Sequence, residues 1–166
     1  MHDKTVLAKI EKADIEELKR IISMYVSSLH INLSFQDIDR ELEDFPKKYD
    51  EPEGAFVVAK VNGMTCGCVG LRKIGQGICE MKRLYVLDEF KGRGIGRRLV
   101  QRIVEEGRVK GYAKMRLDTL RDMKPALALY RASGFYEIGP YTYNPIEGAV
   151  YMEIDLENRS PREAHA

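Results

Sequence analysis

The sequence predicts a single-domain α/β (α+β) fold in which about four helices flank a mixed, mostly antiparallel central sheet. Three observations predict this fold. The chain has 166 residues, a length that suits one domain. Apolar residues recur at helical spacing in some segments and form short β-branched runs in others. The dipeptide Asn62-Gly63 joins two such runs and predicts an antiparallel hairpin.

The first third of the chain is expected to hold one strand and two helices. An apolar run at 4–10 predicts the strand. Asp14 and Glu17 form a capping-box pattern at the start of the first helix. Ser34 offers the N-cap of a second helix, and Pro46 is expected to end that helix. A polar loop should follow it.

The middle of the chain is typical of an antiparallel sheet. Three runs, at 55–61, 64–74 and 78–86, have the length and apolar character of strands. The Asn62-Gly63 turn separates the first two runs, and a Gly-Gln-Gly turn at 75–77 separates the last two. The pattern therefore predicts a three-stranded meander.

The C-terminal half alternates between helices and strands. A helix should begin within the glycine-rich stretch that starts at Lys91 and should end near Gly111. Pro125 is tolerated in the first turn of another helix, which Gly134 should end. The remaining elements are expected as a strand at 114–120, a helix at 123–133 and strands at 135–138 and 149–156.

Composition argues against several classes of function. Lys plus Arg is 27 and Asp plus Glu is 26, so the formal net charge is +1. This balance does not favour general binding to nucleic acid. No apolar run approaches the roughly 18 residues of a membrane span, and no secretory signal is recognisable. We therefore expect a cytoplasmic protein with no nucleic acid or membrane partner.

Three cysteines, Cys66, Cys68 and Cys79, lie close together in the sequence. Cys66 and Cys68 are two positions apart and are expected to face the same side of a strand. Their odd number and the absence of a signal peptide favour a reduced state. The three histidines are scattered, so the ligand spacing of a metal site is missing and no metal is expected.

The stretch "KGRGIGRRLV" at 91–100 combines alternating glycines with a cluster of cations at a helix start. Glycine allows a ligand to approach the backbone closely, and the first N–H groups of a helix carry partial positive charge. Together these features predict a phosphate site. The spacing does not match G-x-G-x-x-G and no G-K-[ST] follows, which argues against two common nucleotide motifs. A solvated basic helix start is the alternative.

Two motifs make the chain similar to the GNAT superfamily of N-acetyltransferases. Residues 84–100 resemble its central motif, [RQ]-x-x-G-x-[GA], here written from Lys91 to Gly96. Residues 126–135, "ALALYRASGF", resemble its A-x-x-L-Y-x-x-x-G-F segment. The resemblance extends over about 4–156 and implies a GNAT-like fold. It divides the chain into an acetyltransferase domain at 1–156 and a polar C-terminal tail at 157–166.

The resemblance implies acetyl-CoA, or a related acyl-CoA, as the donor. The backbone of 93–97 would hold the pyrophosphate, and the splayed strand end at 84–86 would pair with the pantetheine arm. Two departures are visible, because Lys91 replaces the usual Arg or Gln and Met123 replaces an Asn that often contacts the pantetheine arm. The implied cofactor-binding residues are Leu84, Tyr85, Val86, Lys91, Gly92, Arg93, Gly94, Ile95, Gly96, Arg97 and Tyr130.

Acetyl transfer to an amine needs a base, an oxyanion donor and an acid for the leaving thiolate. Glu80 is the candidate base, since an even separation from Val86 in a regular strand puts both on one side. A bulge would reverse that parity, and a solvated cross-strand partner of Lys or Arg is the alternative role. By resemblance, the Val86 N–H is the oxyanion donor and Tyr130 is the general acid. A core aromatic is the alternative for Tyr130.

The acceptor site is less well defined by the sequence. Arg83, with the adjacent lysine, could favour an acceptor that bears a carboxylate. Tyr141, Tyr143 and Asn144 could line the acceptor pocket, although turn and packing roles are equally natural for Tyr143 and Asn144. The candidate substrate-binding set is Arg83, Tyr143 and Asn144. The sequence leaves the possibility of a homodimer open.

The predicted function is transfer of an acetyl group from acetyl-CoA to a primary amine of a small molecule or peptide. The amine would attack directly in a ternary complex, so no cysteine nucleophile is required. The first alternative is a non-catalytic module that binds acyl-CoA and regulates a partner. A second alternative is a regulatory protein that binds another nucleotide or phosphate through the glycine-rich turn.

Overall fold

The computed structural model describes residues 4–29 and 37–157. In this part of the chain seven strands and four α-helices form one mixed sheet with helices on both faces, as the sequence predicted. The strands are β1 (Thr5–Lys9), β2 (Ala55–Val61), β3 (Met64–Gly75), β4 (Ile78–Val86), β5 (Lys114–Leu120), β6 (Tyr136–Ile138) and β7 (Ala149–Asp155). The helices are α1 (Ile15–Ser28), α2 (Ile38–Glu43), α3 (Ile95–Val109) and α4 (Lys124–Ala132).

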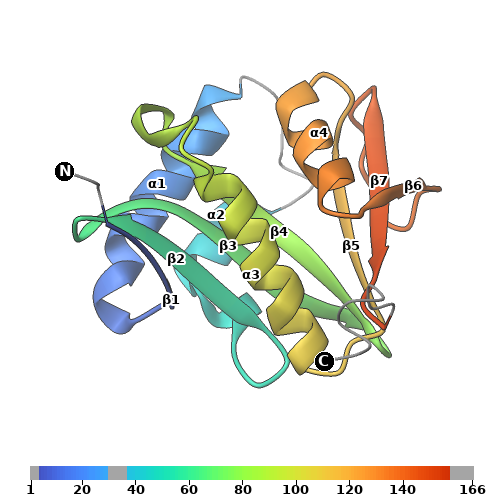
Figure 1. Ribbon diagram of the computed structural model, residues 1–166, viewed down its shortest axis with the longest axis horizontal. Helices are drawn as coiled ribbons and strands as arrows, with labels where there is room; N and C mark the ends of the chain where they lie inside the picture. Colours follow the sequence, from blue (N-terminus) through green and yellow to red (C-terminus); the bar gives the residue numbers. More distant parts are fainter. Residues whose placement is uncertain (1–3, 30–36, 158–166) are drawn as a thin grey trace.

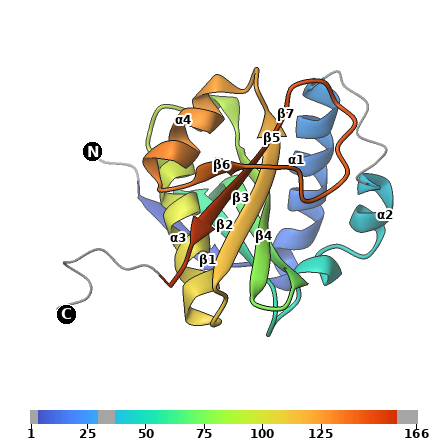
Figure 2. The ribbon, with the colours of Figure 1, turned by 90° about the vertical axis from the view of Figure 1, so that its right-hand side faces the viewer.

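The sheet has the order β1-β2-β3-β4-β5-β7-β6. Its pairs are antiparallel except for β4 and β5, which run parallel at the centre. Helices α3 and α4 cover one face, and α1 and α2 cover the other (Figures 1 and 2). Among the described residues, no helix has the length and apolar character needed to cross a bilayer.

Two apolar cores hold the layers together, one on each face of the sheet. Strand β2 contributes to both, because successive side chains of a strand point to opposite faces. Val57 belongs to the core under α3, whereas Phe56 and Val58 belong to the core under α1. Burial of β2 on both faces explains why its first five residues, 55–59, form a continuous apolar run.

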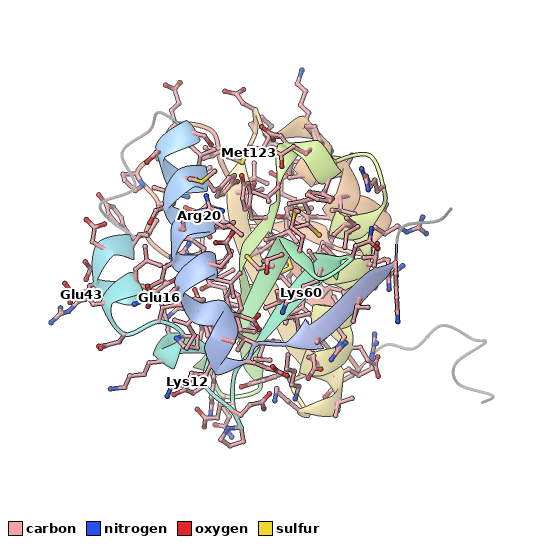
Figure 3. The ribbon with its side chains drawn as sticks, turned by 90° about the vertical axis from the view of Figure 1, so that its left-hand side faces the viewer. Lys12, Glu16, Arg20, Glu43, Lys60 and Met123 are labelled. Carbon is pink, nitrogen blue, oxygen red and sulfur yellow. The ribbon has the colours of Figure 1, made fainter. Side chains whose placement is uncertain are left out.

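The capping box predicted at Asp14 and Glu17 is wrong. Asp14 instead closes a box one turn earlier, in a short 3₁₀ segment (Lys12–Asp14), where its carboxylate accepts the Glu11 N–H at 2.9 Å. The Asp14 carboxylate also pairs at 2.8 Å with Lys60, which Figure 3 labels. Glu17 pairs with Arg20 on the helix surface. Asp14 therefore fixes the turn that leads into α1 and ties it to β2.

The second helix is shorter than predicted. Helix α2 starts after Asp37, which has a left-handed backbone with φ of 52°, and Ser34 lies outside the described residues. The loop predicted to follow Pro46 contains a 3₁₀ turn (Lys47–Tyr49), and Tyr49 is buried beneath α2. This aromatic anchor holds the loop against the sheet, which a polar composition did not indicate.

Candidate active site

The central strands β4 and β5 pair over a short length and then separate. Their parallel pairing joins Ile78–Glu80 to Lys114–Arg116 and does not extend further along either strand. A pocket of about 170 Å³ lies where the two strands have separated. Both strands contribute to its wall, so the site lies inside the sheet rather than on one of its faces. Its lining residues include Tyr25, Ile38, Lys82, Leu84, Asp118 and Tyr130.

A β-bulge in β4 shapes this opening. Tyr85 lies opposite Cys68, and Lys82 lies opposite Gly70, so Arg83 and Leu84 together oppose one residue of β3. Arg83 takes the left-handed backbone conformation with φ of 60°. The extra residue reverses the side-chain alternation beyond it.

The bulge overturns the expectation that Glu80 and Val86 face the same side. Met81 and Val86 both pack on the core under α3, although they are five positions apart. Glu80, next to Met81, therefore faces the α1 side, opposite to Val86. A regular strand would have placed them together, and the bulge is the physical reason that it does not.

The backbone of Val86 faces the opening. The Leu87 N–H donates to the Cys66 carbonyl at 2.8 Å, while Val86 lies opposite Gly67. In an antiparallel pair this pattern makes Val86 and Gly67 a non-hydrogen-bonded pair. The N–H and C=O of Val86 therefore point away from β3, toward the side from which β5 has departed.

The backbone at the start of α3 is not covered by other atoms. Helix α3 lies on the face of the sheet on which the Val86 side chain packs. Gly92 and Gly94 have φ of 81° and 77°, and a Cβ added to either would meet no atom within 4 Å. Gly94 is the N-cap, and the first helical bond runs from the Arg98 N–H to the Gly94 carbonyl at 3.1 Å. The N–H groups that precede Arg98 in the helix are thus not used by it. They form a concave donor set without obstructing side chains at these two glycines.

Three of the cations around this turn already have contacts. Lys91 pairs with Asp88 at 2.8 Å on the surface, and that hydrogen bond raises the pKa of Lys91. The Arg93 guanidinium lies over the Phe90 ring at 5.1 Å. Arg98 is turned toward β1, with Nη1 3.4 Å from the Thr5 carbonyl oxygen. At this turn the backbone N–H groups, rather than these three side chains, are therefore the donors left available to a ligand.

Tyr130 reaches the pocket from α4. It is buried, and its ring packs edge-on against Phe135 at a centroid distance of 5.9 Å. Burial raises the pKa of Tyr130, and the nearby Tyr25 and Asp118 add to this effect. Met123 also lines the pocket, and the Thr119 hydroxyl lies 3.7 Å from its sulfur. The phenol thus stays protonated at neutral pH and can donate a hydrogen bond into the pocket.

Glu80 is held in a buried network. Its carboxylate is 1% exposed and accepts hydrogen bonds from Arg72 Nε at 2.8 Å and from the Tyr141 hydroxyl at 2.6 Å. Burial raises the pKa of Tyr141, and the charge of Glu80 raises it further. Arg72 is the cross-strand partner of Glu80, as the alternative interpretation had it, although the Glu80 carboxylate is buried and only Arg72 is partly exposed. Glu80 does not line the pocket.

Asp118 is the carboxylate on the pocket wall. Its side chain is 6% exposed, accepts a hydrogen bond from Asn144 Nδ2 at 3.0 Å, and lies 3.7 Å from Lys82 Nζ. Lys82 also lies 4.0 Å from Glu80, so it bridges the two carboxylates. The sequence interpretation missed Asp118, because a polar residue in the alternating run "KMRLDTL" is equally typical of a solvated strand face. The pairing of Asn144 with it was a signal available only in three dimensions.

The other candidate acceptor residues are placed differently. Arg83 lines the pocket, but its guanidinium forms a double hydrogen bond with Glu41. Tyr143 is 73% exposed and does not line the pocket. Tyr85 packs on Tyr25 with ring centroids 4.4 Å apart, facing α1.

The cysteines do not take part in the site. Cys66 lies in the core under α3 and Cys68 in the core under α1, so the expectation that they face one side is wrong. A register shift between β2 and β3 next to Ala59 explains the difference. Burial raises the pKa of Cys68 and of Cys79 to about 12, so both thiols are protonated. Among the described residues, no group of three or more His, Cys, Asp or Glu is arranged to hold a metal.

Comparison with known proteins relates this geometry to one family. Residues 18–135 match the acetyltransferase (GNAT) family. An uncharacterized N-acetyltransferase of Schizosaccharomyces pombe is 39% identical over 145 residues, which cover 86% of this chain and 89% of that protein. A GNAT-family acetyltransferase structure from Staphylococcus aureus superposes with a TM-score of 0.78 at 19% identity, over 92% of this chain and 99% of that one. The PaiA N-acetyltransferase of Thermoplasma acidophilum, solved with coenzyme A, superposes with a TM-score of 0.71 at 17% identity and the same coverage.

Proposed function

Because the chain belongs to the acetyltransferase (GNAT) family, we propose that it transfers an acetyl group from acetyl-CoA to a primary amine of a small molecule or peptide. Acyl-CoA is the donor that the family uses, and amines are its acceptors. The observation that carries the proposal is the opening between β4 and β5, with a pocket between the strands. The amine would attack the donor directly within a ternary complex.

The donor would bind along the α3 and α4 side of the opening. The backbone N–H groups at 93–97 suit a pyrophosphate, since Gly92 and Gly94 leave free space and the helix start carries partial positive charge. Lys91, Arg93 and Arg97 would add positive charge, and Ile95 and Gly96 belong to the same turn. The strand end from Leu84 through Tyr85 to Val86 would offer backbone groups to the pantetheine arm.

Val86 and Tyr130 would act on the donor thioester. The Val86 N–H faces the opening and is suited to donate to an oxyanion. The Tyr130 phenol, whose pKa is raised by burial, would donate a hydrogen bond as charge builds on the departing sulfur. Neither role needs a covalent intermediate with the enzyme.

We assign the acceptor amine to Asp118 rather than to Glu80. An alkyl ammonium has a pKa near ~10 and must lose a proton before it attacks. Asp118 lines the pocket, whereas Glu80 is held by Arg72 and Tyr141 behind Lys82. Asp118 would take the proton directly or through one water, and Glu80 would act through Lys82 as a positioning residue. Asp118→Asn should then lower kcat more than Glu80→Gln, and the reverse order would return the role of base to Glu80.

The acceptor side of the pocket favours an amine with an apolar body. Val26, Leu29, Ile38 and Ile146 line it together with Asp118. The two cations that suggested a carboxylate-bearing acceptor, Lys82 and Arg83, are already ion-paired. Alkyl and arylalkyl amines should therefore react faster than amino acids or polyamines.

Thiol release from acetyl-CoA over a panel of amines tests the proposal. The panel should contain arylalkyl amines, amino acids, polyamines and peptide N-termini, and mass spectrometry should identify the acetylated product. At least one primary amine should raise release well above the rate of hydrolysis. Binding of acetyl-CoA without transfer to any amine would favour the non-catalytic acyl-CoA module, which Met123 in the usual asparagine position supports.

A further inference from the structure

We propose that Glu41 is a positioning residue that holds Arg83, and through it the β4 bulge, in the shape the site requires. The inference rests on the proposed function for its catalytic readout. Glu41 does not line the pocket and comes from α2, on the far side of the bulge from the donor side. Its effect would pass through the backbone of β4.

Arg83 has an unfavourable backbone conformation for its residue type. Three described non-glycine residues have positive φ: Asp37, Asn62 and Arg83. Aspartate and asparagine tolerate this region, and those two lie at a helix cap and in a hairpin turn. Arg83 lies within a strand and has a long side chain, so its conformation must be stabilised by its surroundings.

Glu41 supplies that stabilisation through an ion pair with Arg83, in which both carboxylate oxygens accept hydrogen bonds. Its carboxylate is 2% exposed and accepts from Arg83 Nε at 2.9 Å and Nη2 at 2.8 Å. The Tyr49 hydroxyl donates to the same carboxylate at 2.9 Å, and Lys48 Nζ lies 3.2 Å away. A two-pronged contact fixes the direction as well as the position of the guanidinium.

Tyr49 packs on the neighbouring strand β3 opposite the start of the bulge. A Cβ on Gly70 would lie 2.9 Å from the Tyr49 ring, so the ring packs directly on the β3 backbone. Gly70 is the partner of Lys82, the residue that precedes the bulge. The Glu41–Tyr49–Arg83 cluster therefore contacts both strands where the register shifts.

The bulge decides which backbone groups face the pocket. If β4 paired regularly, its register beyond Lys82 would change by one residue. Val86 would then exchange its orientation with its neighbours, and its N–H would turn toward β3. Holding the bulge is thus equivalent to holding the oxyanion donor of the proposed reaction.

Glycine and alanine at position 83 separate this role from substrate binding. Glycine adopts positive φ without penalty, whereas alanine does not, and both remove the guanidinium. Arg83→Ala should lower kcat roughly tenfold, in line with the cost of a left-handed non-glycine residue, and Arg83→Gly should lose much less. Glu41→Ala should resemble Arg83→Ala, and adding Arg83→Gly to it should restore turnover where adding Arg83→Ala does not.

A second readout does not depend on turnover. The backbone amide resonances of Val86 and Leu87 in the free protein, which are not sequence neighbours of position 83, should stay near wild-type positions in Arg83→Gly and shift in Arg83→Ala. If the wild-type protein acetylates no amine, the proposed function is wrong. The amide resonances would still show whether Glu41 and Arg83 hold the bulge. Equal behaviour of the Gly and Ala variants in both readouts would overturn the inference. Equal loss with a raised KM, confined to carboxylate-bearing acceptors, would instead make Arg83 a substrate-binding residue.

Discussion

Tyr130 is the residue that we propose meets the leaving sulfur. It lines the pocket, and burial raises its pKa, so the hydroxyl stays protonated and can donate a hydrogen bond. Tyr130→Phe removes the hydroxyl while keeping the ring that packs on Phe135. We expect the rate of thiol release to fall about a hundredfold, as for the loss of a general acid, while acetyl-CoA affinity is largely kept. An unchanged rate would remove Tyr130 from the chemistry.

The ion pair of Glu41 should make the free energy of unfolding depend on pH in the acid range. Burial raises the pKa of its carboxyl, but the hydrogen bonds from Arg83 and Tyr49 and the charges of Arg83 and Lys48 together outweigh this, so the pKa lies below its ordinary value. A lowered folded-state pKa stabilises the protein above the unfolded value of about 4.3, and this stabilisation is lost as the pH falls through the folded-state pKa. The contribution of Glu41 should therefore be present at neutral pH and absent in strong acid.

Urea unfolding of Glu41→Gln checks this expectation. The variant should be less stable than wild type by about 2 kcal/mol at pH 7, and the difference should shrink below pH ~4. Glu43→Gln is the matched control, because Glu43 is an exposed residue of the same helix, at its outer edge in Figure 3. A difference between wild type and Glu41→Gln that is independent of pH would contradict the assigned ion pair.

At the scale of elements, one glycine lies at each end of helix α3. Substitutions at these two positions distinguish a loss of anion binding from an effect of backbone strain. Gly94 lies at its start and Gly111 just beyond its end, with φ of 77° and 88°, and a Cβ at either would meet nothing within 4 Å. Gly94→Glu should abolish acetyl-CoA binding by calorimetry, through steric block and charge repulsion. Gly111→Glu carries similar strain and the same charge and should keep the affinity. Equal affinities in both folded variants would refute the phosphate assignment.

Regular elements were predictable because each has a local signal. The β2–β3 hairpin follows from Asn62-Gly63, whose φ values of 51° and 83° match the predicted turn. The bulge has no such signal, since "ICEMKRLYV" contains no glycine and its left-handed residue is an arginine. Both parity errors, at Glu80 and at Cys68, come from register shifts of this kind. Alternation along a strand predicts the facing of a side chain only as far as the next bulge.

The candidate site was predictable where motifs carry it. The two family motifs direct attention to Leu84 and Tyr130, which the structure brings to one pocket. Asp118 and Glu41 were not found, because their importance comes from partners distant in sequence, Asn144 and Arg83. Contacts of that range depend on the packing of layers and leave no local pattern.

At the scale of the whole molecule, the sheet separates two helical layers, to which we assign the donor and the acceptor. Helices α3 and α4 lie on one face of the sheet, and α1 and α2 lie on the other (Figure 2). The opening between β4 and β5 joins these two faces. In the proposed reaction the two substrates would enter from opposite sides and meet at the Val86 backbone. We propose that acetyl-CoA binds within this opening.

Amide hydrogen exchange at Val86 and Leu87 tests whether acetyl-CoA binds there, because the N–H groups of these neighbours point to opposite edges of β4. The Leu87 N–H is bonded to Cys66 and should exchange slowly with or without ligand. The Val86 N–H faces the opening and should exchange quickly in the free protein. At saturating acetyl-CoA its exchange should slow by up to about a hundredfold at a ligand concentration of 100 Kd. An unchanged exchange rate of the Val86 N–H at millimolar acetyl-CoA would contradict binding of the donor within the opening.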